Sequence, residues 1–512
     1  MPHIKELIVV MGIAIAVFLA ARPLCLAFMR DEDFTLRRNV WIALTACAFL
    51  SPSFWLYVLV AVAVLAWAGR RDSNPAALYL VAFGVIPPVT IYIPVVGINT
   101  LFALSQARIL ALVLLLPLAL RLFSVNEGGL ARKWMALDWL LVAYLVLQLA
   151  LVSPYETATA TMRRGFLLAI DTLLVYYVFS RALLSRRALV DTMAAFVLVG
   201  AVYASIGIFE SFKGWLMYEQ IGLDWGSPAK VFSFLARGGH LRAQASAGHA
   251  LTLGYILCVA FGFWLYLRTR IHSSTARFVT TALFCVGIYT THSRGPWLTA
   301  VVVYLAYLFI APGGKPAFFK GIGALALFLG GLALTPLGER VFATLPFIGT
   351  QDQDTIVYRQ TLAERSWQLV LQNPFVGDPF VLRNLADLRG GLDFVDLMNA
   401  YAAVALFYGF IGLGLFVLFF ALATGRAYLR QRRLRVPDPD LSGIGAALVA
   451  CMVASLFFMA TASIDWVEYV LAGLLTSYVS LLALGREPEA RAVAGPVAPT
   501  PASGFALNKS PW

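Results

Sequence analysis

Apolar segments long enough to span a bilayer alternate with short polar connections along most of the chain. A transmembrane helix needs about 20 consecutive, mainly apolar residues. The 41–69 run is too long for one simple span and contains Ser51-Pro52-Ser53, which offers a break. The pattern predicts an all-α, polytopic integral membrane protein with about 12–15 transmembrane helices. The runs lie at 7–29, 41–69, 76–97, 105–123, 134–152, 165–180, 188–212, 246–267, 276–293, 296–312, 319–336, 398–423, 442–462 and 466–484.

Composition supports the same class. Hydrophobic residues make up 60% of the chain and charged residues only 13%, whereas an ordinary soluble protein is about 25% charged. This excludes a water-soluble globular protein, a disordered chain and a fibrous repeat. The five cysteines are scattered through apolar runs without CxxC spacing, so the sequence indicates neither a disulfide framework nor a zinc site.

The excess positive charge predicts the orientation. The net charge is +12, and in membrane proteins basic residues gather in the cytoplasmic loops, so we expect no nucleic-acid partner. The sequence leaves open on which side the N-terminal segment lies, since Arg30, Arg37 and Arg38 fall on the cytoplasmic side only if 41–69 is a hairpin. The basic residues of the alternate, predicted cytoplasmic loops are Arg70, Arg71, Arg132, Lys133, Arg181, Arg186, Arg187, Arg268, Arg270, Arg277, Lys315, Lys320, Arg426, Arg430, Arg432, Arg433 and Arg435.

This orientation leaves two larger loops on the opposite, periplasmic side. The larger one contains a predicted short amphipathic helix at 364–371, stopped by Asn373-Pro374. Loops of this length are usually functional, so we expect the chemistry here. The predicted organisation is N-terminal transmembrane helices in 1–212, a smaller periplasmic loop in 213–245, transmembrane helices in 246–336, a large periplasmic loop in 337–397, C-terminal transmembrane helices in 398–484 and a disordered cytoplasmic tail in 485–512.

Several arginines lie on the periplasmic side, against the general pattern. Arg294 stands between two apolar runs, where a buried guanidinium costs roughly 2.5–3.5 kcal/mol unless it has an anionic partner or lines a wet cavity. A single arginine of this kind can also extend to lipid headgroups. A cluster of them suits a phosphate or pyrophosphate, whose oxygens a guanidinium binds two at a time. The set comprises Arg163, Arg164, Arg242, Arg294, Arg359, Arg365, Arg383 and Arg389; the first two could serve either a lipid headgroup or the substrate.

Three motifs follow one another in the second half of the chain. They are Ser293-Arg294-Gly295; Tyr358-Arg359-Gln360 with Trp367 and Asn373-Pro374-Phe375-Val376-Gly377; and Asp396-Leu397-Met398-Asn399-Ala400-Tyr401 with Gly409-Phe410-Ile411-Gly412-Leu413. In this order they resemble the O-antigen ligase and O-antigen/exopolysaccharide polymerase superfamily, and the resemblance covers roughly 200–425.

The resemblance implies a metal-independent, inverting glycosyltransferase of the bacterial inner membrane that works at the periplasmic face without a cofactor. Its donor would be a glycan on undecaprenyl pyrophosphate, and a flippase and a chain-length regulator of the same pathway would be partners. Arg294 and Arg359 would grip the donor pyrophosphate, with Arg242 as a third contact. Arg389, Asn399 and Trp367 are candidates for binding the acceptor or glycan.

One departure concerns the general base. Ligases of this family carry a histidine where this chain has Met398, and a thioether cannot accept a proton. Asp396, Asp393 and His292 are the alternative bases, although Asp396 could instead cap the following helix. We therefore expect a polymerase of lipid-linked repeat units. The alternatives are a ligase that uses lipid A–core or another acceptor, and a transporter or flippase without chemistry.

Overall fold

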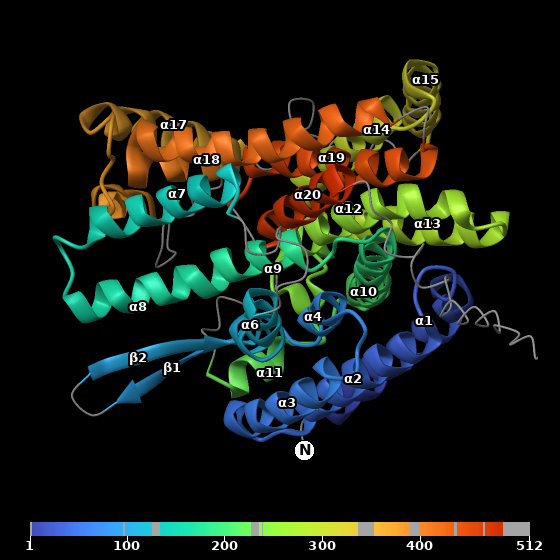
Figure 1. The fold of residues 1–512 in the computed structure, drawn as a ribbon, viewed down its shortest axis with the longest axis horizontal. Helices are drawn as coiled ribbons and strands as arrows, with labels where there is room; N and C mark the ends of the chain where they lie inside the picture. The colour runs from blue at the N-terminus through green and yellow to red at the C-terminus, as the bar shows by residue number, and fades with distance from the viewer. Residues whose placement is uncertain are drawn as a thin grey trace, which may run out of the picture.

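The computed structural model describes residues 3–95, 98–124, 134–226, 235–237, 239–335, 353–389, 397, 399–434, 438–463 and 466–484. Helices dominate this part of the chain, which confirms the all-α polytopic class (Figure 1). Within it, seven helices are long and apolar enough to cross a membrane, and four shorter apolar helices accompany them. Asp393, Asp396 and Met398 lie outside the described residues.

The N-terminal part contains α1 (Ile4–Cys25), α2 (Asp31–Leu50), α3 (Phe54–Gly69) and α4 (Pro75–Phe83). Ser53 separates α2 from α3 and caps α3, because its side chain accepts the N–H of Leu56 at 3.4 Å. The 76–97 run is predicted to be a span, and this prediction is wrong. After α4 the chain forms an antiparallel hairpin of β1 (Thr90–Val95) and β2 (Ile98–Ser105), with Thr90 opposite Ser105.

Two prolines explain why the 76–97 run does not form one transmembrane helix. Pro87 and Pro88 have no N–H to continue α4, and they restrict the preceding residues to extended backbone. The strands that follow are rich in isoleucine, threonine and aromatic residues, which favour β structure. The hairpin lies at one edge of the molecule beside α8 (Ala158–Leu168) (Figure 1), and its Phe102 contacts Phe166 of that helix.

The middle part begins after the hairpin with one continuous helical stretch, made of α5 (Gln106–Leu110), the π-helical η1 (Ala111–Leu115) and α6 (Leu116–Ser124). It continues with α7 (Ala136–Val152), α8 (Ala158–Leu168), the π-helical η2 (Ala169–Leu174), α9 (Val175–Arg181) and the long helix α10 (Arg186–Lys213). A short α11 (Glu219–Asp224), strands β3 (Ala236–Arg237) and β4 (His240–Leu241), and the 3-10 turn η4 (Ala245–Ala247) then precede α12 (Ala250–Leu267).

The remaining elements are η5 (Arg268–Arg270), α13 (Ser274–Thr290), α14 (Arg294–Ile310), α15 (Gly314–Ala333), α17 (Gln353–Gln372), η6 (Val381–Arg389), α18 (Ala400–Arg433), α19 (Pro439–Met459) and α20 (Val467–Leu484). The helices α10, α12 and α19 form the centre, and most of their residues are buried. The predicted short helix at 364–371 is part of the longer α17, which ends before Asn373-Pro374.

Loops predicted to share the basic face contact one another. Arg186, at the start of α10, lies 2.6 Å from a carboxylate oxygen of Asp438, which precedes α19. Arg270, at the end of the α12 helix, pairs with Asp440. The fully buried Arg37 joins this end through Asp72 at 2.7 Å and Asp191 at 2.6 Å. The opposite ends of these helices therefore form the other face, where the predicted site lies.

Candidate functional site

A buried carboxylate organises the loops at this other end. Glu210 lies in the last turn of α10 and is fully buried. Its oxygens accept the backbone N–H groups of Met217 at 3.0 Å, Gln244 at 2.9 Å and Ala245 at 2.7 Å. A buried carboxylate is costly unless such donors satisfy it. Glu210 thereby ties the turn after α10 to the segment that carries Arg242.

Arg242 reaches from this segment to the turn between α13 and α14. Its Nη2 donates to Ser293 Oγ at 2.8 Å, and its Nε donates to the carbonyl of Thr291 at 3.4 Å. The next residue, Ala243, donates its N–H to the carbonyl of Thr290 at 3.1 Å. The structure therefore places the Arg242 guanidinium against Ser293, the residue that precedes Arg294.

Arg237 also contacts this turn, and sequence reasoning missed it. Its Nη1 donates to the carbonyl of His292 at 2.8 Å. Arg237 lies on β3, which pairs with β4 just before Arg242. The available signal was its position: it is a second arginine of the same predicted periplasmic loop as Arg242.

His292 has an unusual backbone conformation and an uncharged imidazole ring. Its φ is 43°, and it shares a positive φ with Ala245 alone among the described non-glycine residues; such strain often accompanies functional sites. Its ring stacks on His240, with centroids 5.6 Å apart. Burial, together with nearby His240 and Arg242, lowers the pKa of His292 to about 4. Its imidazole is therefore neutral at physiological pH, and the burial that lowers its pKa also makes it a weaker base than a free imidazole.

His249 lies near the same arginine but has a structural contact. Its Nδ1 accepts the N–H of Leu251 at 3.2 Å, which caps α12. Burial and the charge of Arg242 lower the pKa of His249 to about 4. This histidine is thus also neutral.

Arg294 is the first residue of α14 and is half-buried. The turn that carries it packs tightly on two helices. A Cβ added to Gly254 of α12 would lie 2.5 Å from Pro296, and one added to Gly295 would lie 3.1 Å from Thr461 Oγ1. Both glycines permit this approach because they lack a side chain. The start of α14 is therefore fixed between α12 and the residues after α19.

Asn399 meets the same residues after α19. Its Oδ1 accepts the N–H groups of Tyr401 at 3.0 Å and Ala402 at 3.1 Å, and so it caps α18. The adjacent Ala400 donates its N–H to the carbonyl of Ala462 at 3.0 Å. Segment 461–462 therefore contacts the starts of both α14 and α18, and it connects Arg294 to Asn399 through backbone packing.

Two glycines join the outer helix α17 to α18. A Cβ on Gly409 would lie 2.3 Å from the backbone of Phe375, and one on Gly377 would lie 2.6 Å from the nitrogen of Gly409. Gly409 has φ 62° and ψ −168° and breaks α18. At this break the N–H of Phe410 donates to the carbonyl of Pro374 at 2.7 Å. The Asn-Pro-x-x-Gly and Gly-x-x-Gly motifs thus form one backbone junction.

The other predicted site residues are spread over the outer segment. Trp367 lies on α17, is 58% exposed, and has its ring 6.4 Å from that of Phe410. Arg359 lies about two turns earlier on α17, and Arg389 ends η6. Figure 1 shows α17 alongside the outer half of α18. Arg359 and Trp367 therefore belong to an outer helix that the glycine junction holds against the membrane helices.

A cavity of about 290 Å³ lies between the end of α4 and the start of α12. Ser246, four residues after Arg242, donates to the carbonyl of Gly84 at 2.8 Å, and Trp466 stacks on Phe83 with centroids 3.8 Å apart. The cavity wall combines these aromatic rings with the polar side chains of Gln106, Ser246 and Thr252.

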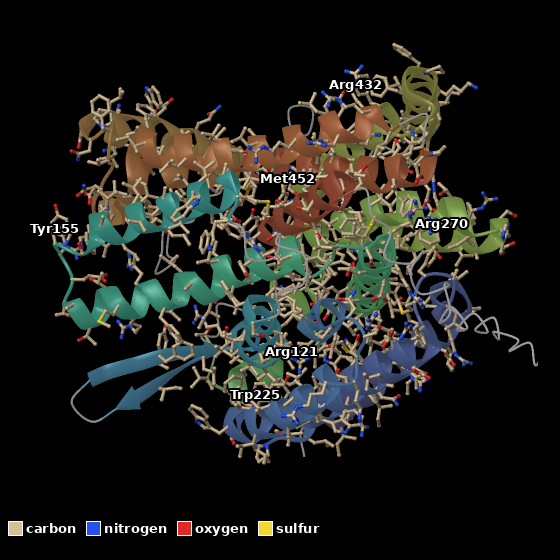
Figure 2. All side chains as sticks on the ribbon, in the orientation of Figure 1. Arg121, Tyr155, Trp225, Arg270, Arg432 and Met452 are labelled. Atoms are coloured by element: carbon tan, nitrogen blue, oxygen red, sulfur yellow. The ribbon has the colours of Figure 1, made fainter. Side chains whose placement is uncertain are left out.

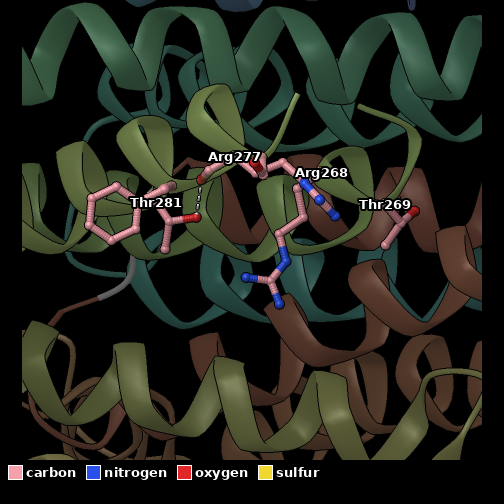
Figure 3. Close-up of a pocket in the computed structure, with 6 residues that line it drawn as sticks. Arg268, Thr269, Arg277 and Thr281 are labelled. Carbon is pink, nitrogen blue, oxygen red and sulfur yellow. Dashed lines mark hydrogen bonds between the residues drawn. The ribbon is translucent and has the colours of Figure 1, made fainter. Parts of the chain in front are cut away.

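A larger cavity of about 610 Å³ lies at the opposite end of the helices. Arg268, Thr269 and Arg277 line it at the junction of α12 and α13 (Figure 3). Arg242 precedes the start of α12, whereas Arg268 follows its end. This cavity is therefore remote from the candidate site.

Residues 279–417 match the family model Wzy_C, described as O-Antigen ligase. The match confirms the resemblance to the ligase and polymerase superfamily. It begins in α13 and ends in α18, so it includes Ser293-Arg294-Gly295, α17 and the glycine junction. No curated protein matches the chain. The match supports a reaction of the O-antigen ligase or polymerase type on a lipid-linked glycan. Arg237 and Arg242 lie outside the matched residues but donate to His292 and Ser293 within them. Glu210, also outside, binds the backbone of Gln244 and Ala245 next to Arg242.

Proposed function

We propose that this chain is an inner-membrane glycosyltransferase that polymerises undecaprenyl-pyrophosphate-linked repeat units into exopolysaccharide or O-antigen at the periplasmic face. The hydrogen bond from Arg242 to Ser293 carries the proposal, because it brings a second arginine to the Ser-Arg-Gly turn of the matched family. The membrane side is inferred from the basic loops, which gather at the other end of the helices.

Arg294 and Arg242 bind the donor pyrophosphate in this account, and Arg359 approaches from α17. Arg294 begins α14, whose first backbone N–H groups and positive dipole end also favour an anion. As the bond between the anomeric carbon and the phosphate oxygen breaks, negative charge develops on the leaving pyrophosphate. Fixed guanidinium groups at that place stabilise the transition state more than the ground state.

The acceptor hydroxyl attacks the anomeric carbon from the side opposite the pyrophosphate, which inverts the configuration. A new carbon–oxygen bond forms, the bond to the phosphate oxygen breaks, and the hydroxyl proton passes to a base. His292 is one candidate for this base because it lies two residues before Arg294 in the turn that begins α14. Asp393 and Asp396 remain alternative bases, and Arg389, Asn399 and Trp367 are proposed to contact the acceptor or the glycan.

The acceptor distinguishes a polymerase from a ligase. Met398 replaces the histidine expected of ligases, which favours a polymerase. The description of the matched family favours a ligase, whose acceptor would be lipid A–core or a similar molecule. Membranes that contain the chain should be given labelled lipid-linked repeat units, with or without lipid A–core.

Formation of longer lipid-linked chains in the absence of lipid A–core supports the polymerase. Transfer of the label only to lipid A–core, with no longer lipid-linked chains, would overturn it. Arg294→Ala and Arg242→Ala should each abolish transfer. Arg432→Ala is the matched control, since Arg432 lies at the other end of the helices (Figure 2). Unchanged transfer by Arg294→Ala and Arg242→Ala would contradict the proposal.

A further inference from the structure

The cavity of about 610 Å³ at the basic end of the helices has no role in the proposed transfer reaction. It is formed where α12 passes through η5 into α13 (Figure 3). The described residues that line it combine two arginines and three hydroxyl side chains with one aromatic ring, and they include no carboxylate: Arg268, Thr269, Ser274, Arg277, Phe278 and Thr281.

Both arginines keep their positive charge available. The nearby carboxylate of Asp440 is already engaged, because it pairs with Arg270 and lies 3.2 Å from Nη1 of Arg186. Within the described part of the chain, Arg268 and Arg277 take part in no ion pair. Two guanidinium groups in a lining without a carboxylate make this cavity a site for an anion.

Hydrogen bonds fix the two sides of the cavity relative to each other. Trp264 of α12 donates from Nε1 to Thr281 Oγ1 at 2.9 Å, and Thr281 Oγ1 donates to the carbonyl of Arg277 at 2.7 Å. Thr269 Oγ1 donates to the carbonyl of Tyr266 at 2.7 Å. These hydroxyl groups hold the backbone, so the guanidinium groups are left as the main contacts for a ligand.

The cavity continues from charged groups into apolar surface. Ser274, Phe278 and Thr281 share one face of α13, because they are four and three positions apart. Their seven positions span about 10 Å along the helix. Phe278 is 74% exposed and the adjacent Val279 57%, and both lie in the predicted span 276–293. The arginines therefore lie beside an apolar surface of the kind that contacts acyl chains.

The chemistry of the lining selects one class of lipid. A guanidinium binds phosphate oxygens two at a time. A zwitterionic headgroup would bring an ammonium group next to two guanidinium groups, and the described lining offers no carboxylate to accept it. An anionic phosphodiester has no such group. Basic pockets between membrane helices at the cytoplasmic side bind anionic headgroups in this way.

We propose that Arg268 and Arg277 bind the phosphate of an anionic phospholipid in the leaflet at the basic face, with Phe278 against its acyl chains. The lipid joins α12 to α13, the two helices whose other ends adjoin Arg242 and Arg294. The proposal does not depend on the transferase function, because it concerns lipid binding at the opposite end of these helices.

The test is native mass spectrometry of the full chain, purified in an uncharged detergent and titrated with phosphatidylglycerol or phosphatidylcholine of the same acyl chains. We expect tighter binding of phosphatidylglycerol. Arg268→Gln/Arg277→Gln should raise its Kd about tenfold, which is about 1.4 kcal/mol. Arg277→Gln alone, at an exposed position, should raise the Kd about threefold, half of that free energy, and it tests the site if the double variant does not fold.

Arg426→Gln/Arg430→Gln is the matched control. It removes the same charge from two exposed arginines of α18 at the same face, and it should leave the Kd for phosphatidylglycerol unchanged. Equal weakening by the two double variants would overturn the proposal, because it would reveal a general attraction of the basic face. Equal affinity of the wild-type chain for the two lipids would also overturn it.

Glycerol 3-phosphate separates a lipid site from a site for a soluble phosphate, because it carries the phosphate without acyl chains. We expect it to leave bound phosphatidylglycerol in place at equal concentration. Displacement of the lipid would assign the cavity to a soluble anion and overturn the proposal. All of these measurements are made without donor or acceptor, so a failure of the transferase function would not imitate a failure of this site.

Discussion

Arg242 donates from Nη2 to Ser293 Oγ at 2.8 Å, although 51 positions separate the two residues. The contact joins a loop outside the matched family segment to the turn that begins α14 inside it. Ser293 Oγ in turn donates to the carbonyl of Thr291 at 2.9 Å. One hydroxyl therefore fixes both the arginine and the turn, and it determines how Arg242 is placed relative to Arg294.

Ser293→Ala should weaken donor binding without unfolding the protein. Hydrogen bonds to charged groups contribute about 1.5–3 kcal/mol, so we expect the KM for the donor to rise by about 10- to 100-fold. The measurement is the donor KM in membranes. Ser273→Ala, which removes the cap of α13 at the other end of the helices, controls for loss of a hydroxyl; equal effects of the two variants would argue against a positioning role.

Glu210→Gln should destabilise both loops at the site. The amide replaces an oxygen that accepts backbone N–H groups, and mispaired buried polar groups cost about 1–3 kcal/mol or more. We expect a lower Tm and loss of transfer. Glu32→Gln, at an exposed position of α2, should change neither. An unaltered Tm for Glu210→Gln would show that the loops do not depend on the carboxylate.

The lowered pKa of His292 predicts a pH dependence of stability. The unfolded chain has a histidine pKa of about 6.5, and the folded value is about 4. The unfolded state therefore binds more protons as the pH falls, so the contribution of neutral His292 is present above pH 6.5 and is lost toward pH 4. His249 has the same sign.

His292→Asn should make the Tm fall less steeply between pH 6.5 and 4 than it does in the wild-type chain. Asparagine tolerates the positive φ at this position. If His292 is the base, the same substitution also lowers kcat at neutral pH. A parallel pH profile of Tm for the two proteins would contradict the assigned neutral state.

Gly409→Ala should separate α17 from α18. Its Cβ would collide with the backbone of Phe375, and its φ of 62° is unfavourable for alanine. We expect a loss of stability of at least about 1–3 kcal/mol and faster proteolysis of the segment that contains α17. Gly414→Ala lies on the same helix with open space around it and should be neutral or slightly stabilising. Matching proteolysis rates would refute the junction.

Much of this arrangement follows from local sequence. Apolar runs predict the helices, and Ser53 and Asn373-Pro374 mark where helices begin or end. Arg294 is recognisable because a guanidinium between two apolar runs needs an explanation. The hairpin was missed because apolar content outweighed the signal of Pro87 and Pro88. Contacts between distant segments, such as Arg237 with His292 or Gly377 with Gly409, depend on tertiary packing that no local pattern encodes.

Arg242 and Arg294 are proposed to hold the donor pyrophosphate during chain elongation. The most direct measurement gives the purified chain lipid-linked repeat units alone and follows both products. We predict a ladder of polymers spaced by one repeat, with one undecaprenyl pyrophosphate released per bond formed, and neither product from Arg242→Ala/Arg294→Ala. An undiminished ladder from that double variant would contradict the account.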